Sequence, residues 1–273
     1  MKADLHVHST YSDGASSVQE VMSLAKQNGV THISFVDHDT VSGLKEIRRQ
    51  GAIHKIEVIP GIEISAYDFK RNRKVHVLGY NYHPDAVNIR ALCEPILERR
   101  HKHSLWQIEQ IKTAGYMLET QEIIESAKLS MTVYKQHIMQ YLTKEPFFSE
   151  KYQTLYKKLF KGKGTAAGDI KYADVFDAVK AIIRDGGLAV VAHPGQLDSY
   201  DLIPELVDIG LSGIERNHMD HNLQDIRRVE SLAKRYSLFM TGGTDYHGSF
   251  GTAISIGDIT SPDMQMFCQC ELS

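Results

Sequence analysis

An alternation of short apolar strands with amphipathic helices is the feature that most constrains the fold of this chain. Helical patterns follow several of the strand-like runs, with a serine N-cap and Gly29 bounding the first helix at 16–29. About seven strand–helix units predict an α/β architecture that resembles a (β/α) barrel. The strand-like runs lie at 5–8, 31–37, 56–66, 74–82, 188–195, 211–217 and 238–248.

The alternation is interrupted between 85 and 169. This region has no good strand pattern, but it has helical patterns at 88–115 and 133–144 and a glycine-rich return loop at 161–169. We therefore expect 1–84 and 170–273 to form the barrel and 85–169 to form a helical insertion that caps it. Trp106 is expected in the core of the insertion.

Composition excludes several classes of protein. The 273 residues carry 31 Lys and Arg against 34 Asp and Glu, a net charge of −3, which gives no overall attraction to nucleic acid or to anionic membranes. Three cysteines, Cys93, Cys268 and Cys270, do not make a disulfide framework and indicate reduced thiols. Without a signal-like or membrane-spanning apolar run, we expect a soluble cytoplasmic protein with no obligate protein partner.

The predicted strands end in side chains that bind metals. In a barrel the carboxyl ends of the strands converge, so these side chains should meet. Imidazoles mixed with carboxylates suit zinc, manganese or iron, and so many donors exceed what one ion requires. Two or three ions could be held if one carboxylate bridges, and Glu63 is the expected bridge because it is the lone acid at its strand end. The nine residues are His6, His8, Asp13, His38, Glu63, His76, His193, Asp245 and His247.

A purely structural interpretation applies to each motif taken alone, since a His-x-His pair or an isolated histidine is common in proteins without metals. We give that interpretation to His32, His54, His83, His101, His103, His137 and His221. The order of the other motifs and their common position at strand ends favour a metal cluster.

Six motifs in this order resemble those of the PHP (polymerase and histidinol phosphatase) family: DLHVHSTYSDG, FVDHDT, PGIEIS, VHVLGY, AVVAHPG and GGTDYHG. The resemblance implies a distorted seven-stranded (β/α) barrel with a centre of two or three divalent ions. Some relatives have histidine at the position of Asp13. The implied ligand sets are His6, His8, Glu63 and Asp245 for one ion, Glu63, His76 and His193 for a second, and Asp13, His38 and His247 for a third.

Such a centre would hydrolyse phosphate esters by attack of a hydroxide that bridges the metals. We expect Glu63, Asp245 and His218 to take part in catalysis. The leaving group could be protonated by Asp245, by His218 or by a metal-bound water. His218 follows a predicted strand and is also expected to contact the substrate phosphate. Asp37 and Asp39 flank His38 and either orient a ligand or cap a turn.

The long insertion resembles the family branch that contains nucleotide phosphatases and 5′-to-3′ exonucleases. Its Arg99 and Arg100 are expected to bind substrate phosphate, helped by Lys102 and Lys135, although a solvated charged face is the alternative. The expected substrate is a nucleoside monophosphate, a 3′,5′-bisphosphate or a 5′-phosphorylated oligonucleotide. One alternative is an enzyme that hydrolyses histidinol phosphate. Another is a polymerase-associated or non-catalytic metal-binding module.

Overall fold

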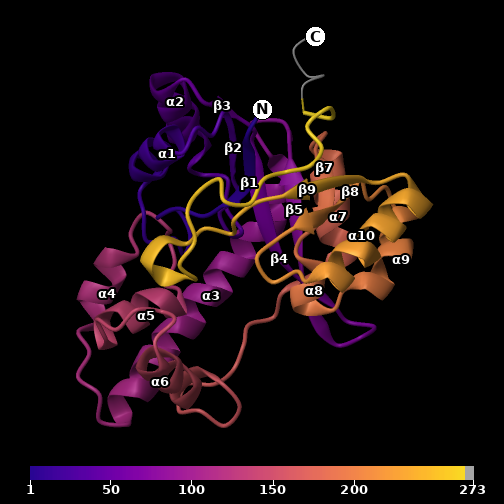
Figure 1. Ribbon diagram of the computed structural model, residues 1–273. Helices are drawn as coiled ribbons and strands as arrows, with labels where there is room; N and C mark the ends of the chain where they lie inside the picture. Colours follow the sequence, from indigo (N-terminus) through magenta and orange to yellow (C-terminus); the bar gives the residue numbers. More distant parts are fainter. Residues whose placement is uncertain (268–273) are drawn as a thin grey trace.

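The computed structural model of the protein describes residues 1–267, so Cys268 and Cys270 lie outside the described residues. Its strands form two sheets (Figure 1). The first sheet is parallel and has the order β1 (Ala3–Val7), β2 (His32–Phe35) and β3 (Glu57–Val58). The second has the order β6 (Ala173–Asp174), β4 (Gly61–Asp68), β5 (Arg73–Tyr80), β7 (Leu188–Val191), β8 (Gly213–Asn217) and β9 (Phe239–Gly242).

The second sheet is mixed, which the strand–helix alternation does not predict. β4 and β5 pair antiparallel over their whole length, and β5 also pairs antiparallel with β7. The cause lies in the connection, because only a short turn joins β4 to β5, and a parallel pair needs a crossover of a dozen or more residues. The remaining pairs, β4 with β6, β7 with β8 and β8 with β9, are parallel.

Two isolated bridges join the sheets at their edges. Val7 bridges to Tyr246 just beyond β9, and His38 just beyond β2 bridges to Glu63 on β4. Val7 and Tyr246 are sequence neighbours of predicted metal ligands, and His38 and Glu63 are predicted ligands themselves. The C-terminal ends of β1 and β2 are therefore held beside β4 and the loop after β9.

Helices cover the outer faces of both sheets. The first sheet is covered by α1 (Val18–Gln27) and α2 (Leu44–His54), and α1 begins with a capping box between Ser17 and Glu20. The second sheet packs against the later helices, whose apolar faces enter one large core (Figure 1). These are α7 (Val175–Arg184), α9 (Ile203–Val207) and α10 (Leu223–Tyr236). The short helix α8 (Pro194–Leu197) follows β7, and 3₁₀ turns lie at η1 (Tyr200–Leu202) and η2 (Gly248–Phe250).

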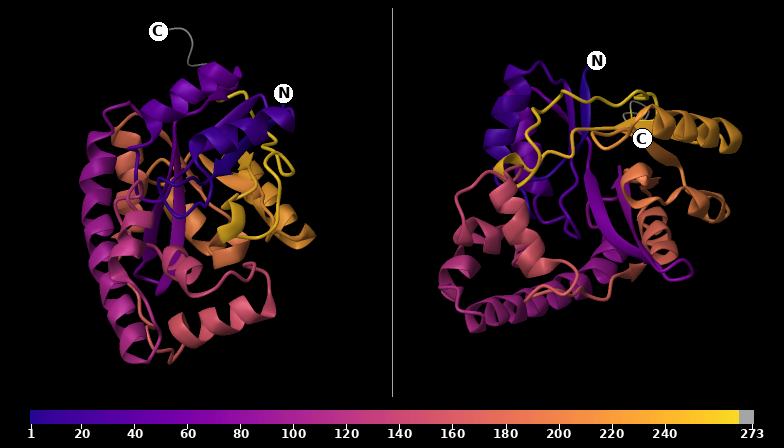
Figure 2. Two further views of the ribbon diagram at one scale, coloured as in Figure 1. Left: turned by 90° about the vertical axis from the view of Figure 1, so that its left-hand side faces the viewer. Right: turned by 60° about the horizontal axis from the view of Figure 1, so that its bottom comes forward.

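Between β5 and β6 the chain forms helices alone. The long α3 runs away from the sheets and carries a group of shorter helices at its far end (Figure 2). These helices share a hydrophobic cluster that includes Ile108, Ile138 and Leu159. Trp106 is not part of it: 42% of its surface is exposed and its ring stacks on His103, so its expected place in the core is wrong. The helices are α3 (Val87–Thr113), α4 (Thr120–Ser126), α5 (Lys135–Leu142) and α6 (Glu150–Phe160).

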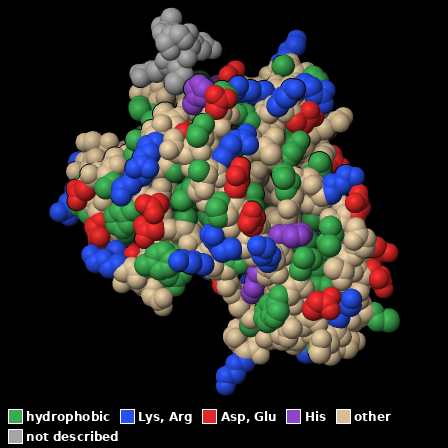
Figure 3. Space-filling view, turned by 180° about the vertical axis from the view of Figure 1, so that it is seen from behind, with side chains coloured by type: hydrophobic (Ala, Val, Ile, Leu, Met, Phe, Trp, Pro, Cys, Tyr) green, Lys and Arg blue, Asp and Glu red, His purple; other side chains and the backbone are tan. Residues whose placement is uncertain are grey.

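The surface carries mixed charge. On the face shown in Figure 3, basic and acidic side chains are interspersed, in keeping with the small net charge. Within residues 1–267, no helix is both long and apolar enough to cross a lipid bilayer.

Candidate metal centre

The first strand places two imidazoles on one face. His6 and His8 are two residues apart at the end of β1, so their side chains point the same way, and their ring centroids are 5.3 Å apart. Both are fully buried. Buried imidazoles so close together need polar partners, and the partners come from other strand ends.

Glu63 is the hub of the cluster. Its side chain is 1% exposed, and its Oε1 lies 2.8 Å from Nδ1 of His76 and 2.9 Å from Nε2 of His193. Its Oε2 lies 3.2 to 3.4 Å from ring nitrogens of three further histidines. One carboxylate thus faces five imidazoles, the arrangement expected of a bridging ligand; those facing Oε2 are His6, His8 and His38.

The loop after β9 contributes Asp245 and His247. Asp4 on β1 accepts hydrogen bonds from the backbone N–H and the hydroxyl of Thr244, at 3.0 and 2.8 Å, which fixes this loop beside β1. Asp245 has φ of 51°, in the left-handed region that non-glycine residues seldom adopt, so the fold holds it against local preference. Its Oδ1 lies 3.2 Å from Nε2 of both His6 and His8.

The nine predicted ligands all reach this cluster, and the donor atoms of eight of them fall into three groups that differ in part from the expected sets. The first group has the expected members. The second contains His38 where His193 was expected, although His193 contacts Glu63. The third gains His8. The groups are His6, His8, Glu63 and Asp245; His38, Glu63 and His76; and His8, Asp13, His38 and His247.

The residues fit a metal centre, because several of their donor atoms are buried without a hydrogen-bond partner. Nε2 of His8, Oδ1 of Asp13 and Nδ1 of His38 are buried and have no hydrogen-bond partner among the described residues. Buried polar atoms are costly unless they are satisfied, and these point into the same cluster. Divalent cations would satisfy them.

The histidines and carboxylates of the cluster shift one another's pKa values. Burial alone would raise the pKa of Asp245, but His6 and His247 hold it well below its ordinary value. Burial alone would lower the pKa of His6, but Glu215, Asp245 and Glu63 raise it well above its ordinary value. The carboxylates are therefore ionised at neutral pH and available as ligands.

Glu215 is a functional residue that the sequence analysis missed. It is fully buried on β8, accepts a hydrogen bond from the backbone N–H of His193 at 2.8 Å and lies 2.9 Å from Nδ1 of His6. It thereby orients His6 with Nε2 toward the cluster, as carboxylates beside metal-binding histidines do. The available signal was an acid within the otherwise apolar run GIE of a predicted strand.

The flanking polar residues take distinct places. Nε2 of His218 lies 3.3 Å from Oδ2 of Asp245, and its Nδ1 accepts a hydrogen bond from the backbone N–H of Asp220. Asp37 binds the backbone and side chain of Ser9, so it caps a turn. Asp39 accepts a hydrogen bond from the backbone N–H of Ser65 and pairs with an arginine.

A cationic pocket of about 240 Å³ adjoins the cluster, and Asp13, His38 and His76 form part of its wall. Arg100 lines it, 2.6 Å from Asp39 and stacked over the ring of Tyr134 at 4.9 Å. Its other lining residues include Lys74, His103, Lys135, Asp169 and Tyr172.

The side chains of the adjacent Arg99 and Arg100 lie in different places. Arg99 is bound to the backbone oxygen of Lys171 at 2.8 Å and does not line this pocket. Lys135 does line it, and burial lowers the pKa of its ammonium to about 8.

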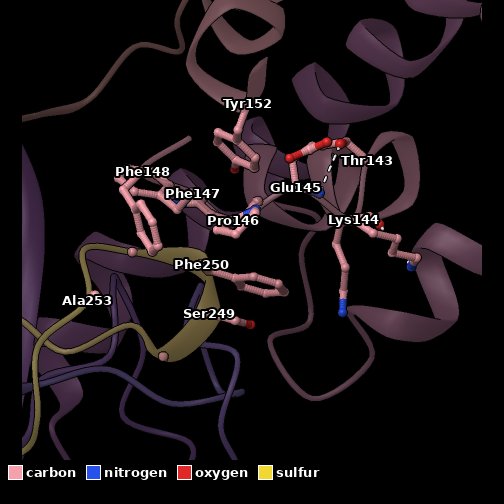
Figure 4. Close-up of a pocket in the computed structure, with 14 residues that line it drawn as sticks. Thr143, Lys144, Glu145, Pro146, Phe147, Phe148, Tyr152, Ser249, Phe250 and Ala253 are labelled. Carbon is pink, nitrogen blue, oxygen red and sulfur yellow. Dashed lines mark hydrogen bonds between the residues drawn. The ribbon is translucent and has the colours of Figure 1, made fainter. Parts of the chain in front are cut away.

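A second, aromatic pocket of about 400 Å³ lies where the turn between α5 and α6 meets η2, directly after His247 (Figure 4). Gln136 borders both pockets. The rings in its wall are Phe147, Phe148, Tyr152 and Phe250.

Comparisons with known proteins agree with these features. The chain is 51% identical to phosphoribosyl 1,2-cyclic phosphate 1,2-diphosphodiesterase of Eggerthella lenta, over 94% of this chain and 98% of that protein. It is 28% identical to 3′,5′-nucleoside bisphosphate phosphatase of Chromobacterium violaceum, over 89% and 86%. A solved candidate metal-dependent phosphoesterase of Bifidobacterium adolescentis has the same fold, with a TM-score of 0.86 at 22% identity over 96% and 92%.

The model of the PHP domain matches residues 4–190, which include six of the nine clustered ligands. The match, the long alignment at 51% identity and the histidine–carboxylate cluster lead to one conclusion. The chain belongs to the PHP-domain family and is a metal-dependent phosphoesterase with a mixed α/β fold.

Proposed function

We propose that this enzyme hydrolyses a cyclic phosphodiester on a phosphorylated ribose. The observation that supports the proposal is the cationic pocket, which places Arg100 and Lys135 beside the Glu63 cluster. A substrate with two phosphate groups would use both places, with one phosphate at the metals and the other in the pocket. The substrate in the name of the Eggerthella lenta relative, a phosphoribosyl cyclic phosphate, has two phosphate groups of this kind.

We propose a centre of two or three divalent ions, zinc, manganese or iron, held by the nine clustered side chains. Ions bound there would supply Lewis-acid activation of water and of the phosphate oxygens. Glu63 would balance the charge of more than one ion, because both of its oxygens face imidazoles.

His218 is the proposed proton donor for the leaving oxygen. Its Nδ1 accepts a hydrogen bond from the backbone, so its proton is carried on Nε2, which faces Asp245. Interactions with Asp245 and Glu215 raise the pKa of His218 against the opposing effect of burial, so Nε2 of the neutral ring holds its proton more firmly than a free imidazole would. As water adds to phosphorus and the ester P–O bond breaks, this proton would pass to the departing oxygen.

Arg100 and Lys135 would bind the phosphate that does not react. A guanidinium matches two phosphate oxygens at once, and its contacts with Asp39 and Tyr134 fix its plane before substrate arrives. Arg100 and Lys135 both lie in the region 85–169, so we propose that this region caps the centre and selects the substrate, with 1–84 and 170–273 forming the catalytic domain.

The two bridges between the sheets support a finer statement of the fold. Val7 with Tyr246 and His38 with Glu63 connect the edges of the two sheets. We infer that one distorted seven-stranded barrel results, made of β1, β2, β4, β5, β7, β8 and β9.

A nucleotide is the second candidate substrate, and the aromatic pocket favours it. The Phe147, Phe148 and Phe250 rings could stack on a base whose phosphate lies at the metals. The Chromobacterium violaceum relative, a nucleoside bisphosphate phosphatase, is consistent with this candidate.

One substrate panel tests both candidates. The manganese-loaded enzyme would be assayed on phosphoribosyl 1,2-cyclic phosphate, adenosine 3′,5′-bisphosphate, AMP, a 5′-phosphorylated short RNA and histidinol phosphate. We expect the highest kcat/KM for the cyclic phosphate. A higher value for a nucleotide would establish the second candidate, and a preference for histidinol phosphate would overturn both.

A further inference from the structure

Gln136 lies where the helical region 85–169 meets the metal centre. It is the second residue of α5, and its Nε2 donates a hydrogen bond of 2.8 Å to Oδ2 of Asp13. The same residue forms part of the walls of both the cationic and the aromatic pockets. A side chain from outside the two sheets therefore holds one of the clustered carboxylates.

The hydrogen bond leaves the two oxygens of Asp13 in different roles. Oδ1 is buried, has no hydrogen-bond partner among the described residues, and lies 3.3 Å from Nε2 of His247 and 3.8 Å from Nδ1 of His8. A carboxylate can rotate about its terminal bond and exchange its oxygens. By binding Oδ2, the amide selects Oδ1 as the oxygen that faces the imidazoles.

The start of α5 is itself fixed against the loop that carries His38. The hydroxyl of Tyr134 donates a hydrogen bond of 3.1 Å to the backbone oxygen of His38, and its backbone N–H donates one of 3.0 Å to Nδ1 of His137. Arg100 stacks over the Tyr134 ring. Gln136 is thus held in a set position relative to both Asp13 and His38.

The chemistry of an amide suits this position. A glutamine donates a hydrogen bond without adding positive charge, so Asp13 keeps its full negative charge for a cation. A lysine or arginine there would compete with a metal ion for that charge.

We propose that Gln136 is a positioning residue, which aims Oδ1 of Asp13 at the ion shared with His8, His38 and His247. The inference rests on the metal centre proposed above. It makes occupancy of that ion site depend on the helical region as well as on the strand ends.

Metal binding tests this role without any substrate. Gln136→Met keeps the length of the side chain and removes the N–H donors. Gln140→Met is the matched control, because Gln140 is exposed one turn further along α5. Manganese titrations of metal-free protein by calorimetry would give the number of ions and the Kd of each step.

We expect Gln136→Met to raise the Kd of one binding step by about 10- to 100-fold, the usual effect of losing a partner of a metal ligand. The other steps, the Tm of the metal-free protein and all values for Gln140→Met should stay at wild type. If Gln136→Met does not fold, Gln136→Asn provides the same test, since its shorter side chain cannot reach Asp13.

Two results would overturn the inference: an unchanged Kd at every step, or a uniform loss at all steps with a lower Tm, which marks a general structural role. Wild-type protein that binds its ions but cleaves no phosphate ester would refute the proposed function alone. The metal-binding difference between Gln136→Met and Gln140→Met would still stand.

Discussion

Nδ1 of His6 lies 2.9 Å from Oε1 of Glu215, a carboxylate that solvent does not reach. The two residues are 209 positions apart in the chain, and β1 and β8 bring them together. The other oxygen of Glu215 accepts a hydrogen bond from the backbone of His193, so one buried acid fixes parts of two clustered histidines. Its charge also raises the pKa of His6 against the effect of burial.

Glu215→Gln should weaken metal binding while the chain still folds. The amide keeps the size of the side chain but lowers the basicity that the carboxylate gives to His6. We expect a loss of about 10- to 100-fold in the affinity for at least one ion. Calorimetric titration with manganese would measure it, and the exposed Glu230→Gln on α10 is the control. Wild-type affinity in Glu215→Gln would show that His6 is oriented by other groups.

Glu63→Gln tests the bridge itself. One neutral amide cannot balance the charge of two ions, so we expect loss of at least one ion. We also expect a fall in kcat of about a hundred- to a thousandfold, the scale of losing a main electrostatic element. Elemental analysis and steady-state kinetics give the two values, with the exposed Glu57→Gln on β3 as control. Near-normal turnover with a full set of ions would remove Glu63 from this role.

Metal affinity should rise with pH. The pKa of His8 is raised to about 10, because its interactions with Asp245 and Glu63 outweigh burial, so the ring is protonated at neutral pH before an ion binds. Binding must then release protons, and the release costs less as pH rises. Calorimetry at pH 7 in buffers of different ionisation enthalpy would count the protons. Heats that do not depend on the buffer would contradict this prediction.

His6, His8, His38, His193 and Asp245 could be predicted because they lie at or just beyond the carboxyl ends of β1, β2, β7 and β9. Glu63 lies near the start of β4 and His76 in the middle of β5, so their expected place at the ends of strands is wrong, although both reach the cluster. Glu215 was missed because an acid inside a predicted strand does not reveal which residue it contacts, and its partner His6 is distant in the chain. The antiparallel pairs of the second sheet were also not predicted, because the direction of pairing follows from the short turn after Asp68 rather than from the apolar pattern.

Which of the two adjacent arginines faces the metal centre could not be predicted from the sequence. Successive residues on a helix point about 100° apart, so the run LERRHKH cannot tell which side chain faces the centre. Packing of α3 decides it, and Arg100 lines the cationic pocket while Arg99 binds a backbone oxygen. Gln136 carries no charge to mark it, and its role emerges only from its distance to Asp13.

Arg100 and Arg99 form a matched pair for substrate recognition. Arg100→Gln should raise KM for a substrate with two phosphates by about 10- to 150-fold, the range for losing a hydrogen bond to a charged group. KM for p-nitrophenyl phosphate, which has a single phosphate, should change far less. Arg99→Gln should alter neither value. Equal effects of Arg100→Gln on both substrates would indicate damage to the centre rather than loss of recognition.

Lys135 should give substrate binding a dependence on pH. Burial lowers the pKa of its ammonium to about 8, opposed by Asp169 and assisted by Lys74, Lys161 and Arg100, which all bear on it. The side chain is charged below that pH and neutral above it, so the pocket loses a positive charge as pH rises through about 8. We expect kcat/KM for a substrate with two phosphates to fall over this interval, since kcat/KM reports ionisations of the free enzyme.

The test of Lys135 compares pH profiles. A profile for p-nitrophenyl phosphate should lack the fall near pH 8, because that substrate leaves the pocket empty. Lys135→Arg should keep binding and move the fall upward out of the measured range, since a guanidinium stays charged. The exposed Lys102→Arg on α3 should leave both profiles as they are. If the fall persists in Lys135→Arg, it comes from the metal centre and not from this lysine.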